Sequence, residues 1–433
     1  MNLLYVTSNI PHSKGEAVET VNLEILKALE DKIENVYLLI ILAENATFAE
    51  KENIYLNDLK KLKIKNIKIL PILESKRKID NIFLLLIRYL FPTKKTVYPS
   101  SLFKKKIQKI VDENNIDTIF QSWDYPGVAA VNEIKVLKKI LYYGQPDHKP
   151  SVVRLADGKI FDIQYKGFLG LIKKFLLKRA SNFKEKCHLD MIKNFDEIHT
   201  ICYGAYQDYL KNGIKKIQYT QNIWPISDKI SFEPKVNNKC KIVGSVGSNN
   251  ATGNGINFYY IGKYLRNKLD KKLKKNYEIN FYGKFTTSRY LSNLLNSERL
   301  IFRGWVKDLD KEVISSDIFL ICHNSIYENR FIKSKNGQWQ MGGCHTRFLY
   351  AWSVGCPIVT HSMNKKFMPE LEHNYNVLMG DNEEEIANHI SNLYKDIKLR
   401  KKLILNGNLT LMKYFTPEVV VKKLFKIGNY EKV

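Results

Sequence analysis

The stretch from Met341 to His361, MGGCHTRFLYAWSVGCPIVTH, decides the predicted fold. Two glycines and a polar, basic step precede an apolar run, Phe348 to Val354, that predicts a helix. Gly355 predicts the end of that helix, and Cys356 to Thr360 predicts a short buried strand. Loop, helix, glycine and strand in this order form half of a βαβ unit. The stretch therefore predicts an α/β protein with a parallel sheet.

The start of this predicted helix carries His345, Thr346 and Arg347. Unpaired backbone N–H groups and the positive end of the helix dipole favour an anion there. Arg347 adds a permanent positive charge in the first turn. These features predict an anion-binding helix start, most plausibly for a phosphate group. The competing interpretation is a core helix that carries one exposed arginine.

Strands alternate with helices through both halves of the chain, which favours a doubly wound parallel sheet in each half. We expect a first domain over residues 1–224, a linker over 225–239 and a second domain over 240–416. The closing helix, about 417–433, could pack back on the first domain. Strands in the first half are expected at Asn2–Ser8, Val36–Ala43, Ile67–Ile72, Ile116–Gln121, Lys139–Gly144, Phe195–Cys202 and Gln218–Trp224. Those in the second half are expected at Cys240–Val246, Tyr277–Tyr282, Leu300–Arg303, Asp317–Cys322, Cys356–Thr360 and Tyr375–Met379.

The length and the charge of the chain limit its class. A chain of 433 residues exceeds one ordinary core and indicates about two domains. The 69 Lys and Arg against 44 Asp and Glu give a net charge of +25. This excess indicates an anionic partner: nucleic acid, anionic lipid headgroups or a phosphorylated substrate. A genome rich in lysine, isoleucine and asparagine codons would contribute to the same excess.

The six cysteines and the apolar runs bear on the compartment. The cysteines are scattered without C-x-x-C or metal-ligand spacing, which is typical of reduced thiols in a cytosolic protein. The chain enters a strand without a basic segment and cleavage site, so we expect no signal peptide. The longest apolar run, Ile82 to Phe91, is too short to span a bilayer and contains Arg88. We therefore expect a cytoplasmic chain without a membrane span.

Two segments of the first half carry further candidates. Asp147 and His148 follow a predicted strand end, where α/β domains place their chemistry. A lone Asp-His loop is more often structural, because turns favour Asp and Pro. The segment Phe168 to Arg179, FLGLIKKFLLKR, predicts an amphipathic helix with lysines beside its apolar face. Such a helix can lie on an anionic membrane surface. The alternative is a domain helix whose apolar face lies in the core.

Several motifs of the second half carry a family resemblance. They are F-Y-G at 281–283, F-R-G-W-V at 302–306, S-D-I-F-L at 316–320 and C-H-T-R-F-L-Y-A-W-S-V-G-C-P-I-V at 344–359. Their order resembles the GT-B glycosyltransferases, specifically the retaining family four. The resemblance covers the whole chain and is most specific from about residue 195 onward. It implies two Rossmann-like domains that face a cleft, and transfer of a sugar from a nucleotide donor with retention.

The resemblance also implies roles for individual residues. Residues 304–306 would border the nucleotide base, and Gly247, Asn249, Thr346 and Arg347 would approach the diphosphate. Gly15 would close over the diphosphate from the first domain, although its loop lacks the G-x-G-x-x-G pattern. Asp147 or His148 would take the place of the family's sugar-side or acceptor-side polar residue, and we predict these two as catalytic. The implied donor-binding set is Gly15, Gly247, Asn249, Gly283, Lys284, Gly304, Trp305, Val306, Arg330, Lys333, His345, Thr346 and Arg347.

The chain departs from the family pattern at two points. The family's Glu-x7-Glu pair is absent, because Gly342 and Tyr350 stand at its positions. The usual Arg and Lys after the first strand of the second domain are also missing. Arg330, Lys333 or Arg347 could supply the lost charge, since the leaving diphosphate needs a cation or a helix dipole. We expect no metal cofactor, because the GT-B glycosyltransferases that the chain resembles generally need none. An inactive or regulatory relative remains an alternative.

The leading hypothesis is a cytosolic glycosyltransferase that works peripherally at the inner membrane surface. Its donor would be a nucleotide sugar. Its acceptor would be a lipid-linked surface glycan of the lipopolysaccharide, capsule or exopolysaccharide type. One alternative is a GT-B nucleotide-sugar 2-epimerase. Another is a non-enzymatic basic protein that binds nucleic acid or membranes, although the sequence shows no nucleic-acid-binding motif and its lysines are spread over both halves.

Overall fold

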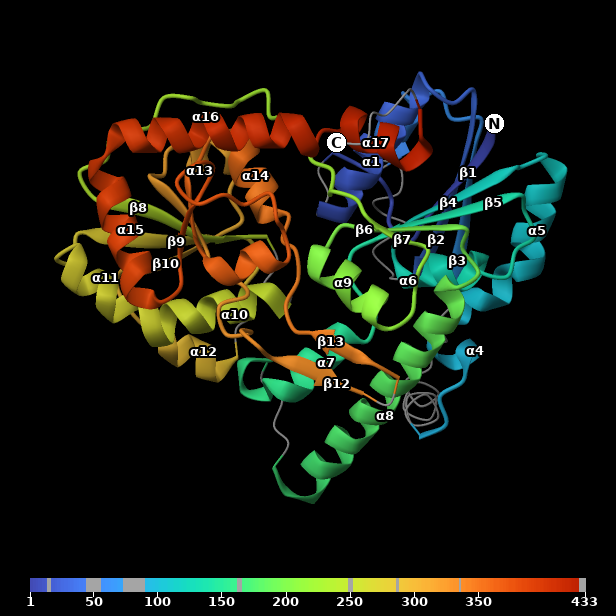
Figure 1. Cartoon of the computed structure of the whole chain (residues 1–433), viewed down its shortest axis with the longest axis horizontal. Coiled ribbons are helices and arrows are strands. Elements are labelled where there is room, and N and C mark those ends of the chain that lie inside the picture. Colours follow the sequence, from blue (N-terminus) through green and yellow to red (C-terminus); the bar gives the residue numbers. More distant parts are fainter. Residues whose placement is uncertain are drawn as a thin grey trace.

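The computed structural model describes residues 1–13, 17–43, 56–72, 90–161, 166–247, 252–285, 288–334 and 336–427. The chain forms two α/β units that lie side by side, each built around its own parallel sheet (Figure 1). We call the unit that carries the N-terminal strands the first unit and the other the second unit. Both sheets are covered by helices, as the apolar strand sequences predict.

The first unit contains a seven-stranded sheet in the order β3-β2-β1-β4-β5-β6-β7, with all neighbours parallel. Its strands are β1 (Asn2–Thr7), β2 (Asn35–Ala43), β3 (Asn66–Ile72), β4 (Thr118–Trp123), β5 (Lys138–Tyr143), β6 (Glu197–Thr200) and β7 (Ile217–Tyr219). Its helices are α1 (Ala17–Glu30), α4 (Lys94–Val97), α5 (Lys104–Glu113), α6 (Tyr125–Val131), α7 (Lys149–Ala156), α8 (Gly167–Ile192) and α9 (Tyr203–Lys211), with 3-10 turns at Pro99–Phe103 and Gly158–Phe161. The strand predicted to reach Trp224 is shorter than expected, because pairing with β6 ends at Tyr219.

The second unit contains a six-stranded parallel sheet in the order β10-β9-β8-β11-β14-β15. Its strands are β8 (Cys240–Val246), β9 (Tyr277–Tyr282), β10 (Leu300–Gly304), β11 (Ile318–Ile321), β14 (Ile358–His361) and β15 (Leu378–Gly380). Its helices are α10 (Thr252–Tyr260), α11 (Arg266–Lys272), α12 (Arg289–Leu294), α13 (Leu309–Ile314), α14 (Arg347–Val354), α15 (Glu383–Lys395) and α16 (Ile397–Tyr414), with a π-helical turn at Ile261–Leu265 and a 3-10 turn at Ser362–Lys366.

Helix α14 forms where the apolar run 348–354 predicts it, and Gly355 ends it. Gly355 adopts the left-handed conformation (φ +79°), and a Cβ at this position would lie 2.1 Å from the carbonyl oxygen of Ser231. Glycine is therefore required here, both because of the left-handed backbone conformation and because a side chain would clash with Ser231. The strand that follows, β14, pairs with β11 and β15 and completes the predicted βαβ half.

An antiparallel hairpin, β12 (Phe331–Lys333) and β13 (Gln338–Gln340), leaves the second unit and packs on the first. The Trp339 side chain is fully buried, and its Nε1 donates to Oε1 of Glu185 on α8 at 2.6 Å. The backbone N–H of Gln340 donates to Oδ2 of Asp208 on α9 at 2.7 Å. No sequence pattern predicts this hairpin, which anchors the second unit to the helices of the first.

The chain crosses between the units twice more, at the opposite end of the molecule (Figure 1). The backbone N–H of Trp224 donates to the carbonyl of Phe415 at 2.9 Å, so the outgoing and returning segments lie together. Helix α17 (Pro417–Phe425) then packs against α1. Val420 and Leu424 belong to the same apolar cluster as the strands β1 and β2.

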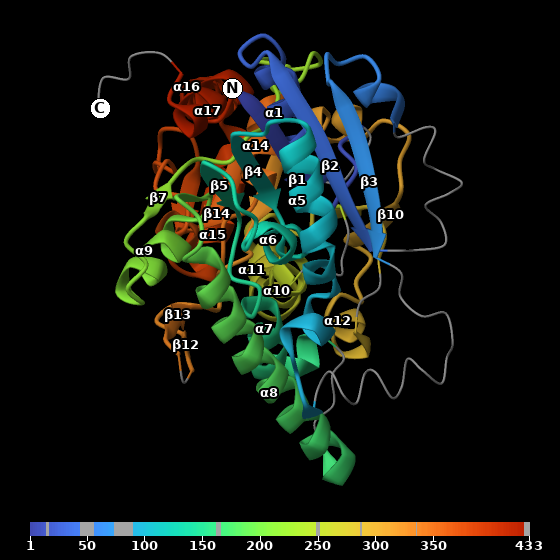
Figure 2. The ribbon, with the colours of Figure 1, turned by 90° about the vertical axis from the view of Figure 1, so that its right-hand side faces the viewer.

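The N-terminal turns of α8 project away from both sheets (Figure 2). Their apolar side chains are not in the core: Phe168 is 78% exposed, Leu169 is 80% exposed and Phe175 is 60% exposed. The interpretation of this segment as a core helix is therefore wrong. In the described part of the chain, no helix has the length and apolar character needed to cross a membrane. Most of the apolar run Ile82 to Phe91 lies outside the described residues.

A buried ion pair in the second unit gives a test of the fold. Arg400 donates from Nη1 to Oδ1 of Asp317 at 2.6 Å, and the two side chains are 2% and 0% exposed. Arg400→Met leaves the Asp317 carboxylate buried without its cation, so we expect a loss of about 3–5 kcal/mol in the free energy of unfolding. Chemical denaturation measures this loss. The control is Lys401→Met, whose exposed pair with Glu233 is worth about 0–1 kcal/mol. Equal stabilities for the two variants would contradict the prediction.

Candidate functional site

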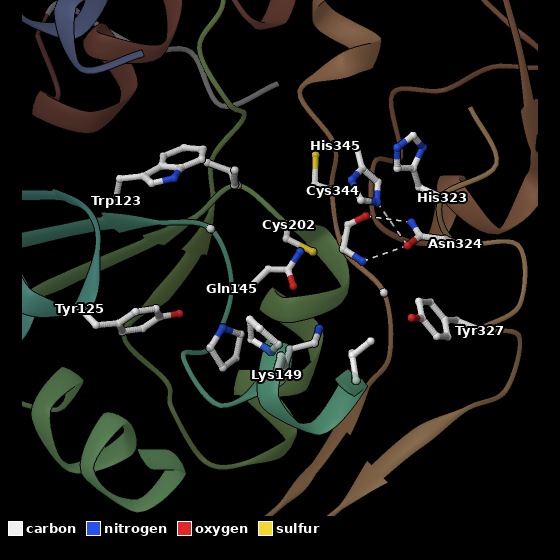
Figure 3. Close-up of a pocket in the computed structure, with 17 residues that line it drawn as sticks. Trp123, Tyr125, Gln145, Lys149, Cys202, His323, Asn324, Tyr327, Cys344 and His345 are labelled. Carbon is white, nitrogen blue, oxygen red and sulfur yellow. Dashed lines mark hydrogen bonds between the residues drawn. The ribbon is translucent and has the colours of Figure 1, made fainter. Parts of the chain in front are cut away.

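A pocket of about 360 Å³ lies between the two units (Figure 3). The first unit supplies side chains from the ends of β4 and β5 and from the starts of α7 and α9. The second unit supplies the segment after β11 and the loop before α14. The polar, sulfur-containing and aromatic lining residues are Trp123, Tyr125, Gln145, Lys149, Cys202, His323, Asn324, Tyr327, Cys344 and His345.

The side chain of Asn324 holds the loop before α14 in place. Its Nδ2 donates to the carbonyl of Gly343 at 2.8 Å, and its Oδ1 accepts from the backbone N–H of Gly343 at 3.1 Å. The same Oδ1 lies 3.4 Å from Nε2 of His345. A Cβ on Gly343 would overlap the Gln145 amide, at 1.5 Å from its nitrogen. The two units therefore meet closely at this glycine.

Two histidines of the second unit pack against each other near this loop, with their rings tilted by 39°. The ring centroids of His323 and His345 are 4.6 Å apart. Loss of solvation, and less strongly the charge of Arg347, lowers the pKa of His345 to about 3. Loss of solvation, then the charge of Arg347 and that of His345, lower the pKa of His323. Both rings are therefore neutral near pH 7, and each carries one N–H group. Nε2 of His345 donates toward Oδ1 of Asn324, and Nε2 of His323 donates to Oδ1 of Asn254 at 3.2 Å.

Three of the predicted glycines converge at the carboxyl end of the second sheet. Gly247, Gly283 and Gly304 follow or end neighbouring strands and have φ values of +91°, +116° and +66°. The N–H of Gly247 donates to the carbonyl of Tyr282 at 3.0 Å, and the N–H of Gly283 donates to the carbonyl of Gly304 at 2.8 Å. Ligands of open α/β sheets bind at this end of the strands.

Arg347 reaches the same edge of the sheet. Its Nε donates to the carbonyl of Val246, the last residue of β8, at 3.3 Å. Thr346 is the N-cap residue of α14 and is half-buried. The structure thus brings Arg347 and the start of α14 together with the glycine positions.

The other residues that were predicted to bind the donor differ from one another in exposure and position. Trp305 is 75% exposed and Lys284 is also exposed, whereas Val306 packs against an apolar cluster of the second unit. Gly15 and Asn249 lie outside the described residues. Trp305 is available to stack on a planar ligand, because its ring is not used in packing.

Arg330 and Lys333 are not brought to the glycine edge, contrary to the prediction. Arg330 pairs with Asp157 of the first unit at 3.2 Å and lies 5.5 Å from the ring centroid of Tyr327. Lys333 lines a different pocket, against α7 and α8. The cause is the docking of the hairpin on the first unit. Arg330 directly precedes its first strand and Lys333 ends that strand, so both residues lie near the first unit.

Asp147 and His148 do not line the pocket between the units either. Asp147 accepts a hydrogen bond from the Tyr98 hydroxyl at 2.5 Å and pairs with Lys184 at 3.3 Å. The His148 ring meets the Trp339 ring at a centroid distance of 5.0 Å. The chain turns between Pro146 and the start of α7, which directs these two side chains away from the pocket. The prediction of Asp147 and His148 as catalytic residues therefore finds no support in their placement.

Lys149 is a residue of the pocket that was not predicted from the sequence. It lines the pocket, is 1% exposed, and its Nζ has no hydrogen-bond partner in the described part of the chain. The charge of Lys149 acts on the Asp208 carboxylate, whose pKa it lowers against the stronger effect of burial. The buried N–H donors of Lys149 have no acceptor among the described residues, so the site favours a ligand that brings an acceptor oxygen beside them. The sequence feature that could have indicated it is the Lys149-Pro150 pair, because proline favours the first turn of a helix and this helix follows the end of β5.

Tyr350 stands where the resemblance would place the second glutamate of the missing pair. Its hydroxyl donates to Oδ1 of Asp310 at 2.9 Å. Gly342, at the position of the first glutamate, has a φ of +96° and lines the pocket. Neither position carries a carboxylate, and Asp310 brings one next to Tyr350. Within the described residues, no group of three or more His, Cys, Asp or Glu side chains could hold a metal ion.

No protein-family model matches this sequence, and no curated protein matches it. Solved structures do match. HepE of Anabaena, in complex with UDP and glucose, is 12% identical, with 98% of each chain covered and a TM-score of 0.60. TarM of S. aureus, in complex with fondaparinux, α-GlcNAc-glycerol and UDP, is 9% identical, with 98% and 99% covered and a TM-score of 0.61. The lipopolysaccharide outer core galactosyltransferase WaaB is 12% identical, with 98% of each chain covered and a TM-score of 0.54.

These likenesses, together with the two sheets, confirm the predicted GT-B fold. At identities of 9–12% they establish the architecture alone.

The contact between two of the glycines gives a test of the glycine edge. A Cβ on Gly283 would lie 2.2 Å from the carbonyl oxygen of Gly247, and its φ of +116° strains any other residue. Gly283→Ala should therefore lower the free energy of unfolding by about 1–3 kcal/mol, as denaturant titration would measure. Gly144→Ala is the control, because its Cβ would meet nothing nearer than 3.8 Å. If the Gly283 variant were as stable as the control, the backbone at Gly247 and Gly283 would be able to move apart at little cost in free energy.

Proposed function

We propose that this chain is a glycosyltransferase that binds a nucleotide sugar at the glycine edge of the second unit and transfers its sugar into the pocket between the units. The observation that carries the proposal is the convergence of Gly247, Gly283 and Gly304 with Arg347 and the start of α14. Backbone that only glycine tolerates allows a diphosphate to approach closely, and the arginine and the helix start supply positive potential.

In the proposed reaction, the bond between the anomeric carbon and the diphosphate oxygen breaks as the acceptor oxygen bonds to that carbon. Arg347 and the start of α14 stabilise the negative charge that develops on the leaving diphosphate. Lys149 of the first unit lines the pocket that would receive the sugar, and it adds positive charge there. The neutral rings of His323 and His345 line the pocket without adding charge.

The proposal assigns the acceptor proton to the leaving diphosphate. Among the described residues that line the pocket there is no Asp or Glu, and the pKa values of both lining histidines are low. A histidine with a low pKa is a weak base and accepts a proton poorly. When substitution proceeds on one face of the sugar, a phosphate oxygen of the leaving group lies beside the attacking hydroxyl and would take its proton. This route corresponds to retention at the anomeric carbon. The proposal treats the nucleotide sugar as a substrate and includes no metal ion.

Nucleotide binding tests the proposed donor site. A nucleotide at about a hundred times its dissociation constant should stabilise the protein by about 2.7 kcal/mol, which a thermal-shift assay resolves. UDP, GDP, CDP and ADP would be compared with their sugars. UDP is the first choice because HepE and TarM were solved with it. Arg347→Ala should weaken binding of the active nucleotide by about 1.5–3 kcal/mol, the size of a charged hydrogen bond.

The matched control is Arg289→Ala, because Arg289 is an exposed residue of α12. Unchanged affinity in the folded Arg347 variant would remove this residue from the site. A wild-type protein that responds to no nucleotide would contradict the proposed donor site itself. A 2-epimerase would convert the nucleotide sugar without any acceptor, so product analysis in the absence of acceptor separates that alternative.

We also propose that the acceptor is a lipid-linked surface glycan and that the enzyme works peripherally at the cytoplasmic face of the membrane. The support is the net charge of +25 and the exposed apolar residues at the start of α8, which stand among exposed basic residues. Apolar side chains beside lysines are typical of helices that enter the interface of an anionic bilayer. WaaB, which shares the fold, acts on lipopolysaccharide by its description.

Removal of apolar surface from α8 tests this membrane contact. Phe168→Ser combined with Phe175→Ser should lower the partition constant to anionic vesicles by about tenfold or more, because burial of each phenylalanine is worth about 1.5–3 kcal/mol. Co-sedimentation measures the partition constant. Leu137→Ser is the control, since Leu137 is 85% exposed and lies outside α8. Equal binding by both variants would place the membrane contact elsewhere.

A further inference from the structure

A second pocket, of about 240 Å³, lies between α7, α8 and the hairpin strand β12. It shares no lining residue with the pocket between the units. One part of its wall is apolar and the other is polar or charged. The apolar residues are Val152, Leu155, Ala156 and Ile332, and the polar and charged residues are His148, Lys174, Lys178, Ser181, Asn182, Glu185, Lys333 and Ser334. We call this space the lysine pocket.

Three cations converge on the lysine pocket. Lys174 and Lys178 come from successive turns of α8, and Lys333 comes from the opposite wall on β12. All three are exposed, and none of them forms an ion pair with an acidic residue in the ranges that the structure describes. Lysines gathered from two elements without acidic partners repel each other, so a bound anion would relieve this repulsion.

Glu185 is the acidic residue in the wall, and its oxygens are already engaged. Oε1 accepts from Nε1 of Trp339 at 2.6 Å and from the hydroxyl of Ser334, and Oε2 accepts from Nδ2 of Asn336 at 3.4 Å. Its carboxylate therefore holds the hairpin and does not neutralise the lysines. Three lysines against one glutamate leave the wall with a net positive charge.

His148 adds an unsatisfied donor to the same pocket. The residue is 1% exposed, and neither ring nitrogen has a hydrogen-bond partner in the described part of the chain. Burial is the main cause that lowers the pKa of His148 to about 2, so its ring is neutral and carries one N–H group. A buried donor without a partner costs free energy, which an oxygen of a bound ligand would recover.

The lysine pocket adjoins the exposed apolar surface of α8. Leu171 precedes Lys174 by three residues and Phe175 precedes Lys178 by three, so each pair lies on one face of the helix. Leu171 is 62% exposed and Phe175 is 60% exposed. Phe168 and Leu169 lie in the first turn of α8 and are also exposed. This end of the helix projects from the molecule (Figure 2). Positive charge next to exposed apolar surface matches a ligand that has an anionic head and an apolar tail.

We propose that the lysine pocket binds the phosphate of a lipid headgroup, with the apolar chain of that lipid lying along the exposed residues of α8. The inference rests on the proposed work of this chain at a membrane surface and names the lipid chemistry that its first unit recognises. The apolar surface beside the lysines distinguishes a lipid phosphate from a free phosphate ion, which would gain nothing from it.

Vesicles of equal surface charge test the inference. One set contains phosphatidylcholine with phosphatidic acid, and the other contains phosphatidylcholine with enough oleic acid to reach the same surface potential. Wild-type protein should bind the phosphatidic acid vesicles about tenfold more tightly. The double variant Lys178→Gln with Lys333→Gln should lose this preference and bind both sets equally. The matched control, Lys186→Gln with Lys211→Gln, removes the same charge from exposed positions outside the pocket and should keep the preference.

Three results would overturn the inference. They are a wild-type protein without preference between the vesicles, a pocket variant that keeps the preference, and release from the vesicles by millimolar inorganic phosphate, which would assign the pocket to the free ion. Nucleotide binding is measured on the same samples. Intact nucleotide binding in the pocket variant shows that it is folded. A phosphate preference in a protein that binds no nucleotide would leave the lysine pocket standing and remove the proposed transferase.

Discussion

The buried carboxylate of Glu185 is the constraint on which the arrangement of the two units depends. It belongs to the first unit, yet the hydrogen bonds that make its burial tolerable come from the hairpin of the second unit. Separation of the hairpin would leave this carboxylate without its donors and expose the indole of Trp339. The docked hairpin in turn forms one wall of the lysine pocket and draws Arg330 to Asp157. One buried charge thus fixes features that are far apart in the sequence.

The candidate active site divides its positive charge between the units. Arg347 and the start of α14 belong to the second unit, and Lys149 belongs to the first. A donor whose diphosphate lies at Arg347 and whose sugar reaches into the pocket would contact both units, so its binding would favour the arrangement in which the units lie together. The Glu-x7-Glu pair that the resemblance implies is absent, and Tyr350, which donates to Asp310, stands at the position of its second glutamate. The residues that the proposal assigns to the leaving group, Arg347 and the start of α14, are present.

Features with local causes could be predicted from the sequence. Helix α14, its glycine end and the strand-terminal glycines follow from periodicity and backbone requirements of neighbouring residues. The placement of Asp147 and His148 could not be predicted, because the turn at Pro146 decides which side chains of one short segment face the pocket. Arg330 and Lys333 were misplaced for a long-range reason: the hairpin docks through Trp339 and Glu185, which are 154 residues apart. No periodicity within 331–340 encodes that partner.

The two covalent crossings lie together, since Trp224 is hydrogen-bonded to Phe415, and the hairpin bridges the units at the other end (Figure 1). Mechanically, the crossings form a hinge and the hairpin forms a latch. Opening of the pocket about this hinge would have to break the contacts of Trp339 with α8 and α9. Exchange of large ligands would then be timed by release of the latch, and product could leave more slowly than it forms. The exposed apolar turns of α8 and Glu185, which holds the hairpin, belong to the same helix. Contact of those turns with a surface would therefore influence the rate at which the pocket opens.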